Sequence, residues 1–595
     1  MQVLRRTIVG LASVLACVTA RAQHTTRLSV DPGGGQANSV SSYPLVSPDG
    51  RYVLFDSSAS NLVAGDTNGW QDVFLRDRVS GVTTLVSVGT GGVQANGPSV
   101  DYALSADGRF VAFQSSGSNL ASGDTNGAYD IFVHDLQSGQ TAWASVSSAG
   151  VGADSNSFGL ALSLDGRFVS FCSGAGNLVP GDTNGAADVF VRDLQTGQTS
   201  RVSVDSSGAQ ADGQSLASAL SGDGRFVAFS SFASNLVPGD TNALPDIFVH
   251  DRQTGQTTRV SLDSSGAEGD GASVGACAIS ADGRWVAFGS QASNLVPGDT
   301  NNLLDAFVHD RQTGQTTRVD VDSAGTQSDG AISSLSLSAD GRFAAFGSLA
   351  TNLVSGDTNN ASDAFVHDLL TGETTRISLG SAGAPGNSHS DRPAVSSGGR
   401  YIAFESVATN LVPGDTNAQK DIFLRDQDAT GFTSLCEPGS AGVLPCPCAN
   451  PATTSGAGCD NSAASGGAQL SASGVAYLTA DSLVFTTLGE LPSATSILLQ
   501  GDALVGNGLV FGQGVRCAGG VLKRMYARAA LAGSVMLPGP GDPSVSTRSV
   551  LLGDPILPGE PRWYLVYYRD PFVLGGCPAT STFNSTQTAR VDWSL

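Results

Sequence analysis

The sequence is short of positive charge. Only two of its 595 residues are lysine, Lys420 and Lys523, and the formal net charge is −22. A chain this acidic repels phosphate backbones, so we do not expect nucleic acid as a partner, whereas cations and basic surfaces are favoured. The composition still allows a packed core, because 40% of the residues are hydrophobic.

Long apolar runs and helical periodicity are also missing. The apolar run over 7–19 is too short for a spanning helix, and no later segment is long enough to cross a membrane. Two arginines precede this run, and an Ala-Arg-Ala site before Gln23 follows it, which is typical of a signal peptide. We therefore expect residues 1–22 to direct secretion to the periplasm, cell surface or medium. A loose lipobox ending at Cys17 is the alternative.

Histidine is absent beyond His389, which weakens a zinc interpretation of the cysteines that follow. In an exported chain these six cysteines predict up to three disulfides, whose pairing the sequence leaves open. They are Cys436, Cys446, Cys448, Cys459, Cys517 and Cys577.

Repetition is what the sequence has in abundance. The phrase Asn-Leu-Val-x-Gly-Asp-Thr-Asn, or a near copy, occurs seven times between residues 61 and 417. In the repeat over 215–262, four short runs rich in β-branched and aromatic residues are separated by turn signals. Four strands repeated seven times predict an all-β chain with a seven-bladed β-propeller over 23–437.

The repeated motifs carry a family resemblance. Ser-x-Asp-Gly-Arg-aromatic, followed by Asp-x-Phe and a Thr-Gly turn, resembles the TolB-type (WD40-like) propeller repeat. The resemblance covers about residues 24–437 and implies a fold shared by periplasmic scaffolds, propellers fused to peptidases and uncharacterised exported proteins. Residues 25–38 match the last strand of a repeat, so we expect them to complete blade seven. Residues 431–436 are the competing candidate.

The amino-acid composition changes after the repeats. Residues 438–467 are rich in Gly, Pro, Ser and Cys and predict a linker pinned by disulfides. Strand-like runs resume over 468–595 and predict a small β-sandwich. The stretches Cys-Pro-Cys-Ala-Asn-Pro and Arg-Trp-Tyr-Leu-Val-Tyr-Tyr are similar to an uncharacterised cysteine-containing C-terminal module of exported bacterial proteins, which implies no activity.

The motif Asp-Thr-Asn-x-x-x-Asp is the strongest chemical candidate. Its oxygen-bearing side chains could hold Ca²⁺, which takes six to eight oxygen ligands, and its spacing resembles a shortened calcium loop of integrin-type propellers. Asx turns that shape a long loop are the preferred interpretation. The candidate metal ligands are Asp66, Asn68, Asp72, Asp124, Asn126, Asp130, Asp182, Asn184, Asp188, Asp240, Asn242, Asp246, Asp299, Asn301, Asp305, Asp357, Asn359, Asp363, Asp415, Asn417 and Asp421.

Antiparallel strand order places the long Gly-Asp-Thr-Asn and Asp-Ser-x-Gly loops on one face, which we expect to be the working surface. The seven copies differ little, whereas an active site needs different residues in different roles. We therefore predict no catalytic residues and no committed cofactor. The expected function is a monomeric, non-catalytic exported scaffold that binds a protein or glycan. The alternatives are an enzyme acting on glycans in the central channel and a calcium-stabilised structural surface module.

Overall fold

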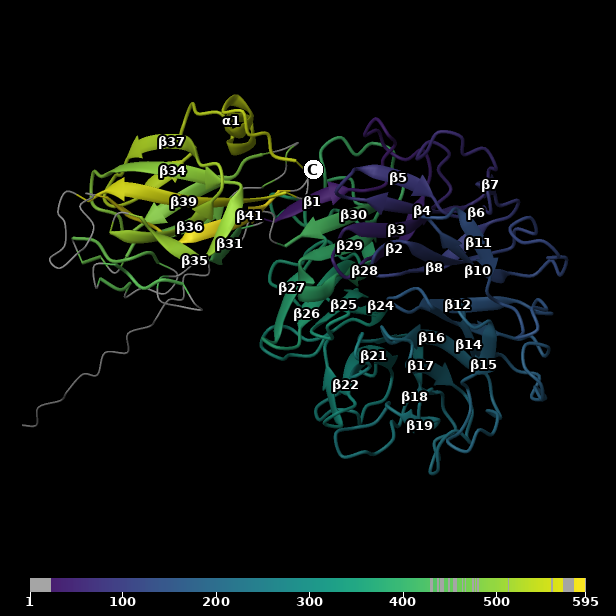
Figure 1. Ribbon diagram of the computed structural model, residues 1–595. Coiled ribbons are helices and arrows are strands. Elements are labelled where there is room, and N and C mark those ends of the chain that lie inside the picture. The colour runs from purple at the N-terminus through teal and green to yellow at the C-terminus, as the bar shows by residue number, and fades with distance from the viewer. Residues whose placement is uncertain are drawn as a thin grey trace, which may run out of the picture.

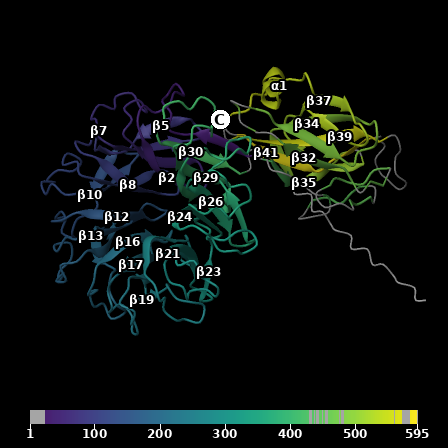
Figure 2. The same cartoon turned by 180° about the vertical axis from the view of Figure 1, so that it is seen from behind.

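Seven four-stranded antiparallel sheets form a ring in the computed structural model, and a second region built mainly of β-strands lies beside it (Figures 1 and 2). No helix in the described part of the chain is long and apolar enough to cross a membrane. The structure describes residues 23–593 except 428–431, 436–437, 439–442, 448–449, 453–456, 463, 466, 474–475, 477, 479–480, 512, 558–559 and 571–582. The expected signal segment 1–22 therefore lies outside the described residues.

Each sheet is one blade, and its four strands lie side by side from the channel to the outer edge of the ring. Blade 1 contains β2 (Ser41–Val46), β3 (Tyr52–Ser57), β4 (Asp72–Asp77) and β5 (Val82–Leu85). Blade 2 contains β8 (Ser99–Leu104), β9 (Phe110–Ser115), β10 (Asp130–Asp135) and β11 (Gln140–Trp143), after the short pair β6 (Val88–Gly89) and β7 (Val93–Gln94). Blade 3 contains β12 (Ser157–Leu162), β13 (Phe168–Ser173), β14 (Asp188–Asp193) and β15 (Gln198–Arg201).

The remaining blades repeat this order. Blade 4 contains β16 (Ser215–Leu220), β17 (Phe226–Ser231), β18 (Asp246–Asp251) and β19 (Gln256–Arg259). Blade 5 contains β20 (Ser273–Ile279), β21 (Trp285–Ser290), β22 (Asp305–Asp310) and β23 (Gln315–Arg318). Blade 6 contains β24 (Ile332–Leu337), β25 (Phe343–Ser348), β26 (Asp363–Asp368) and β27 (Glu373–Arg376). Blade 7 contains β28 (Ser390–Val395), β29 (Tyr401–Ser406) and β30 (Asp421–Asp426), with the 3₁₀ turn η1 (Ser397–Gly399) between the first two.

The N-terminal strand closes the ring. β1 (His24–Arg27) pairs antiparallel with β30 and supplies the outer strand of blade 7. The expected closure by residues 25–38 is thereby confirmed. β31 (Phe432–Leu435), from the competing segment, pairs instead with β41 (Thr588–Asp592) of the C-terminal region.

The propeller core lies between blades. The second and third strands are buried on both faces, which explains their nearly continuous apolar sequence. Val53 and Phe55 of blade 1, for example, share a cluster with Leu424 of blade 7. In every blade a phenylalanine of the second strand packs against one of the third, with ring centroids 5.7–6.0 Å apart.

The Asp-Gly-Arg turns join the first two strands of each blade and have a structural role. Gly50 has φ of 74°, and a Cβ there would collide with the Tyr401 ring of blade 7. The arginine after each turn forms a two-bonded ion pair with the aspartate that ends the third strand, as Arg109 does with Asp135 at 2.8 Å for both bonds. These turns therefore brace one face of the ring.

The Asp-Ser-x-Gly turns lie at the outer rim, so our placement of them on the working face was wrong. Each tip contacts the outer strand of the next blade, where the turn hydroxyl accepts a backbone N–H of a threonine at 2.9–3.1 Å in six joints. In blade 4 the pair is Ser206 and Thr257. Strand order alone did not show that the hairpin bends back between neighbouring blades.

The C-terminal region is a sandwich of two main sheets. Leu470 and Phe485 from the smaller sheet pack against Leu498 and Tyr564 from the larger one. The larger sheet has β31, β41, β39 (Pro561–Arg569), β34 (Thr495–Gly501) and β37 (Lys523–Ala529), with β40 (Phe583–Ser585) on β39. The smaller has β32 (Gln469–Ser473), β33 (Val484–Leu488) and β38 (Val535–Leu537); β35 (Ala503–Phe511) pairs with β36 (Gly514–Gly519), and α1 (Val545–Leu551) is the one α-helix among the described residues.

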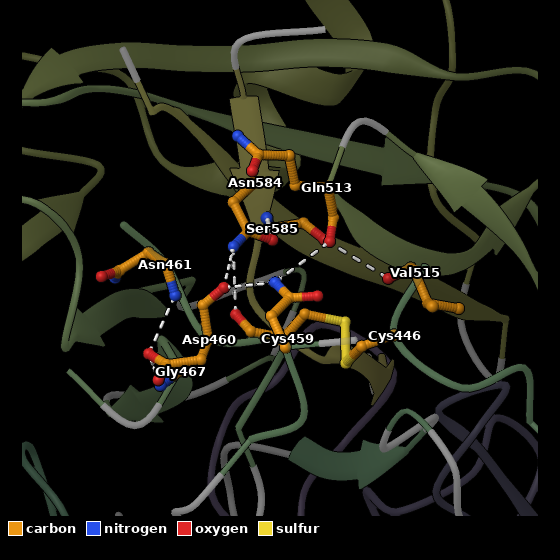
Figure 3. The surroundings of a disulfide bond; sticks show 10 residues. Cys446, Cys459, Asp460, Asn461, Gly467, Gln513, Val515, Asn584 and Ser585 are labelled. Atoms are coloured by element: carbon orange, nitrogen blue, oxygen red, sulfur yellow. Dashed lines mark hydrogen bonds between the residues drawn. A yellow bond between two sulfur atoms is a disulfide. The ribbon is translucent and has the colours of Figure 1, made fainter. Parts of the chain in front are cut away.

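A disulfide ties the segment before the sandwich into the fold (Figure 3). Cys446 bonds to Cys459, and the Asn584 side chain of β40 donates to the carbonyl of Cys459 at 3.1 Å. Cys517 is also disulfide-bonded. The other three cysteines of this group, Cys436, Cys448 and Cys577, lie outside the described residues.

Candidate functional site

The Gly-Asp-Thr-Asn loops form Asx turns. In all seven, the asparagine side-chain oxygen accepts the backbone N–H two residues later, at 2.8–3.1 Å. In blade 1 the Asn68 amide nitrogen faces Asp72, 2.7 Å away. The asparagine therefore presents an N–H group, which cannot ligate a cation, toward the carboxylate.

An arginine supplies the positive charge in five of these loops. It comes from the outer strand, and its guanidinium lies 3.0–3.5 Å from both the first and the last aspartate of the motif. In blade 4, Arg259 also contacts Glu268 at 2.8 Å, so the one described cluster of three acids that could hold a metal already surrounds this cation. The five arginines are Arg27, Arg201, Arg259, Arg318 and Arg376.

Blades 1 and 2 lack this arginine. Leu85 and Trp143 occupy its position. Burial raises the pKa of Asp72 to about 6, and it also raises the pKa of Asp130. The sequence-predicted metal ligands are thus brought together in every blade, and the calcium hypothesis stays a prediction for these two.

A channel runs along the ring axis, bounded by the innermost strands. It holds a cavity of about 590 Å³. One aliphatic side chain from each blade lines it at the same strand position, which is the end away from the Gly-Asp-Thr-Asn loops. This aliphatic ring consists of Val46, Leu104, Leu162, Leu220, Ile279, Leu337 and Val395.

Three positions closer to the Gly-Asp-Thr-Asn loops, the inner strands bulge. Tyr43, Asp101, Ala217 and Arg392 have φ of 53°, 45°, 52° and 51° there, which is a strained conformation for residues other than glycine. The strand register shifts at the bulge in all seven blades, as between Ser42 and Leu45 in blade 1. Strain of this kind is retained where surrounding contacts fix it, and it concentrates at functional sites.

Side chains unique to one blade hold these bulges. The Asp101 carboxylate accepts the Gly159 N–H of blade 3 at 2.9 Å. The Ser218 hydroxyl of blade 4 donates to the Gly159 carbonyl at 2.7 Å. Asp391 accepts from Ser334 of blade 6 at 2.6 Å. The mouth of the channel is therefore the part of the ring where the blades differ.

The joint of blades 7 and 1 carries the most charge at this mouth. The Arg392 guanidinium lies over the Tyr43 ring, 3.9 Å from its centroid, with its Nε 3.6 Å from Glu405. Glu405 is buried and is already paired with Lys420 at 2.9 Å and with the Tyr43 N–H at 2.8 Å. The Arg392 side chain is 41% exposed and lines the cavity, so its fork remains open to a ligand.

A second buried carboxylate lies behind the mouth. Asp56 occupies the position in blade 1 that Glu405 occupies in blade 7, and it is 2% exposed. Its Oδ1 has no hydrogen-bond partner among the described residues. Burial raises the pKa of Asp56 to about 7.

Exposed apolar side chains follow the second strand in three blades, and we call them the apolar rim. Phe232, Leu349 and Val407 occupy equivalent positions in blades 4, 6 and 7, with exposed fractions of 56%, 56% and 36%. Exposed aspartates surround this rim in the neighbouring loops, as where Asp212 accepts the Ser234 N–H at 2.8 Å. The face thus combines an apolar rim with an acidic surround.

The channel mouth was not predicted as a site from the sequence, because the prediction rested on the motifs that repeat in every blade. The signal was present at one column of the repeat, where Tyr, Asp, Gly, Ala, Gly, Ser and Arg replace one another. These residues are Tyr43, Asp101, Gly159, Ala217, Gly275, Ser334 and Arg392. Our statement that the seven copies differ little holds for the outer strands and is wrong for the inner ones.

The comparisons with known proteins concern the fold. No protein-family model and no curated protein matches the chain. Among solved structures, a putative TolB from Agrobacterium tumefaciens is 16% identical, with a TM-score of 0.29 over 47% of this chain and 80% of that one. An oligogalacturonate lyase in complex with manganese is 14% identical, with a TM-score of 0.43 over 69% and 94%.

Pyrococcus horikoshii acylaminoacyl peptidase is 10% identical, with a TM-score of 0.37 over 62% of this chain and 49% of that one. The β-propeller fold of the chain rests on its own seven four-stranded sheets. Similarity this distant says nothing about activity, since the group contains both TolB and enzymes.

Proposed function

We propose that this chain is a non-catalytic, exported scaffold that binds a partner protein at the mouth of its channel. The observation that carries the proposal is the concentration there of residues that differ between blades and are exposed. In the outer strands, by contrast, the same residues recur in every blade and form bonds within the ring. Phe232, Leu349 and Val407 add exposed apolar surface to the same face, and such surface is typical of interaction sites.

The acidic surround favours a basic partner. The rim at Phe232 and Leu349 would pack against an apolar centre, while the aspartates around it attract Lys and Arg. The carboxylates at the mouth are engaged: Asp101 with two backbone N–H groups, Asp391 with serines and Glu405 with Lys420. These engaged acids support binding over acid–base catalysis, and Asp56, whose Oδ1 has no partner among the described residues, is only 2% exposed behind the mouth.

Photo-crosslinking on both faces tests this proposal. A crosslinking residue at Phe232 should capture the partner, whereas the same residue at Thr254, in the exposed turn of the opposite face, should not. The double variant Phe232→Asp, Leu349→Asp should weaken binding at least tenfold and keep the wild-type circular dichroism spectrum. Capture from Thr254 alone would contradict our choice of face, and selective binding on a glycan array would favour a glycan partner.

A further inference from the structure

We propose that the central channel binds a long-chain aliphatic monocarboxylate, tail inward, with its carboxylate on Arg392. This ligand is additional to the partner protein. The cavity of about 590 Å³ is within the usual size of small-molecule sites, roughly 300–1,000 Å³. Its two ends differ in chemistry, and each end selects one part of such a ligand.

The mouth selects a single negative charge. Tyr43 stacks under the Arg392 guanidinium and Glu405 lies 3.6 Å from its Nε, so both hold the fork in place. The two terminal nitrogens match a carboxylate in a two-bonded pair. Asp101 and Asp391 also line or flank the mouth, and their charges disfavour a dianion such as a phosphate monoester.

The interior selects an apolar chain. The aliphatic ring lies three residues along the inner strand from Arg392, which is about 10 Å deeper at strand spacing. Seven aliphatic groups at one level offer no hydrogen bond, so a polar ligand there would lose its water without compensation. An alkyl chain gains by leaving water.

The order of these features favours a fatty acid over a polypeptide end. Arg392 is nearer the Gly-Asp-Thr-Asn face, and Val395 of the aliphatic ring is deeper. A chain entering tail first leaves its carboxylate at Arg392. The C-terminus of a polypeptide entering from the same face would carry its carboxylate past Arg392 into the ring.

Calorimetric titration of residues 23–595 with dodecanoate, dodecan-1-ol and dodecyl phosphate tests the proposal. Dodecanoate should bind. Dodecan-1-ol should bind at least about tenfold more weakly because it cannot form the charged hydrogen-bonded pair, and dodecyl phosphate should bind at least about tenfold more weakly because the carboxylates at the mouth repel its second charge. Arg392→Gln should weaken dodecanoate about 10- to 100-fold and leave dodecan-1-ol unchanged. The matched control is Arg590→Gln, which removes a surface arginine paired with Asp592 outside the channel.

Two further variants keep the test decisive. Arg392→Gly removes the fork at a φ of 51° that glycine adopts freely, so the ring should fold even if the Gln variant does not. Leu220→Trp should fill the ring and abolish binding of both dodecanoate and dodecan-1-ol. Failure of dodecanoate to bind, unchanged affinity in both Arg392 variants, or tighter binding of an apolar peptide with a free C-terminus would overturn the proposal. Partner capture at Phe232 would be unaffected by any of these results.

Discussion

In the outer three strands of every blade the same side chains make nearly the same bonds, whereas the innermost strands differ from blade to blade. Outside, the aspartate that begins the third strand accepts a serine hydroxyl at 2.5–2.6 Å in six of the seven blades. Inside, one column ranges from Tyr43 to Arg392.

The difference separates two tasks. The outer network of hydrogen bonds and ion pairs is repeated because every joint between neighbouring blades has the same geometry. The inner strands have few shared bonds to keep, so their side chains are free to differ and can specify a ligand. Stability should therefore respond strongly to changes outside, and binding to changes inside.

The largest effect should come from removing β1. A chain that starts at residue 39 lacks the outer strand of blade 7 and leaves the buried side chains of Arg425 and Asp421 without Thr25, Ser29 and Arg27. The melting temperature should fall by more than about 10 °C, or cooperative unfolding should be lost. A chain starting at Gln23 is the control, and an equal melting temperature for both would show that β1 does not close the ring.

Asp188→Ala tests the outer network at one blade. It leaves Ser203 without its acceptor and Arg201 with only Asp182, 3.5 Å away, so the free energy of unfolding should fall by about 3–5 kcal/mol, as for other broken buried pairs. Urea denaturation measures it. The control is Asp205→Ala in the exposed turn of the same blade, and an equal loss from both variants would contradict the special role of the buried aspartate.

Asp56→Asn tests the inner layer through pH. The folded pKa of about 7 lies above the unfolded value of about 3.9, so the stability that Asp56 contributes is fully present below about pH 4 and is lost as the pH rises through about 7. Asparagine cannot ionise, so the variant should be more stable by about 2–4 kcal/mol at pH 8 and equal at pH 4. Urea titrations at both pH values measure this, and a difference that persists at pH 4 would show a cause other than ionisation.

Leu85→Arg should have the smallest effect and bears on calcium. It places a guanidinium beside Asp66 and Asp72, as in blades 3 to 7, and should stabilise the ring by about 1 kcal/mol. Thermal melting with calcium or EGTA, in the wild type and in the Leu85→Arg, Trp143→Arg double variant, is the measurement. A calcium-dependent shift that the double variant loses would assign calcium to blades 1 and 2, and no shift in either protein would end the hypothesis.

Local patterns made most of the fold predictable. Three local features specify the blades: the recurring Gly-Asp-Thr-Asn loop, the Asp-Gly turns, and the runs that are apolar on both faces of a strand. They need no information about distant residues, because every blade has the same kind of neighbour on each side. The match of residues 25–38 to an outer strand also identified the closing strand. Whether the Gly-Asp-Thr-Asn loops bind calcium could not be predicted this way. The arginine that pairs with their aspartates, as Arg201 does with Asp182 and Asp188, comes from a later strand of the repeat.

The sequence by itself determined the seven-bladed ring, because periodic burial and turn chemistry are local and repeat every 58 residues or so. Only the tertiary structure decided where the Asp-Ser-x-Gly turns lie, which charges meet in each loop, and that Arg392 stands above an aliphatic ring. These depend on how neighbouring blades approach one another around a shared axis. Residues 58 apart in the chain become neighbours there, and each contributes a single side chain to one channel.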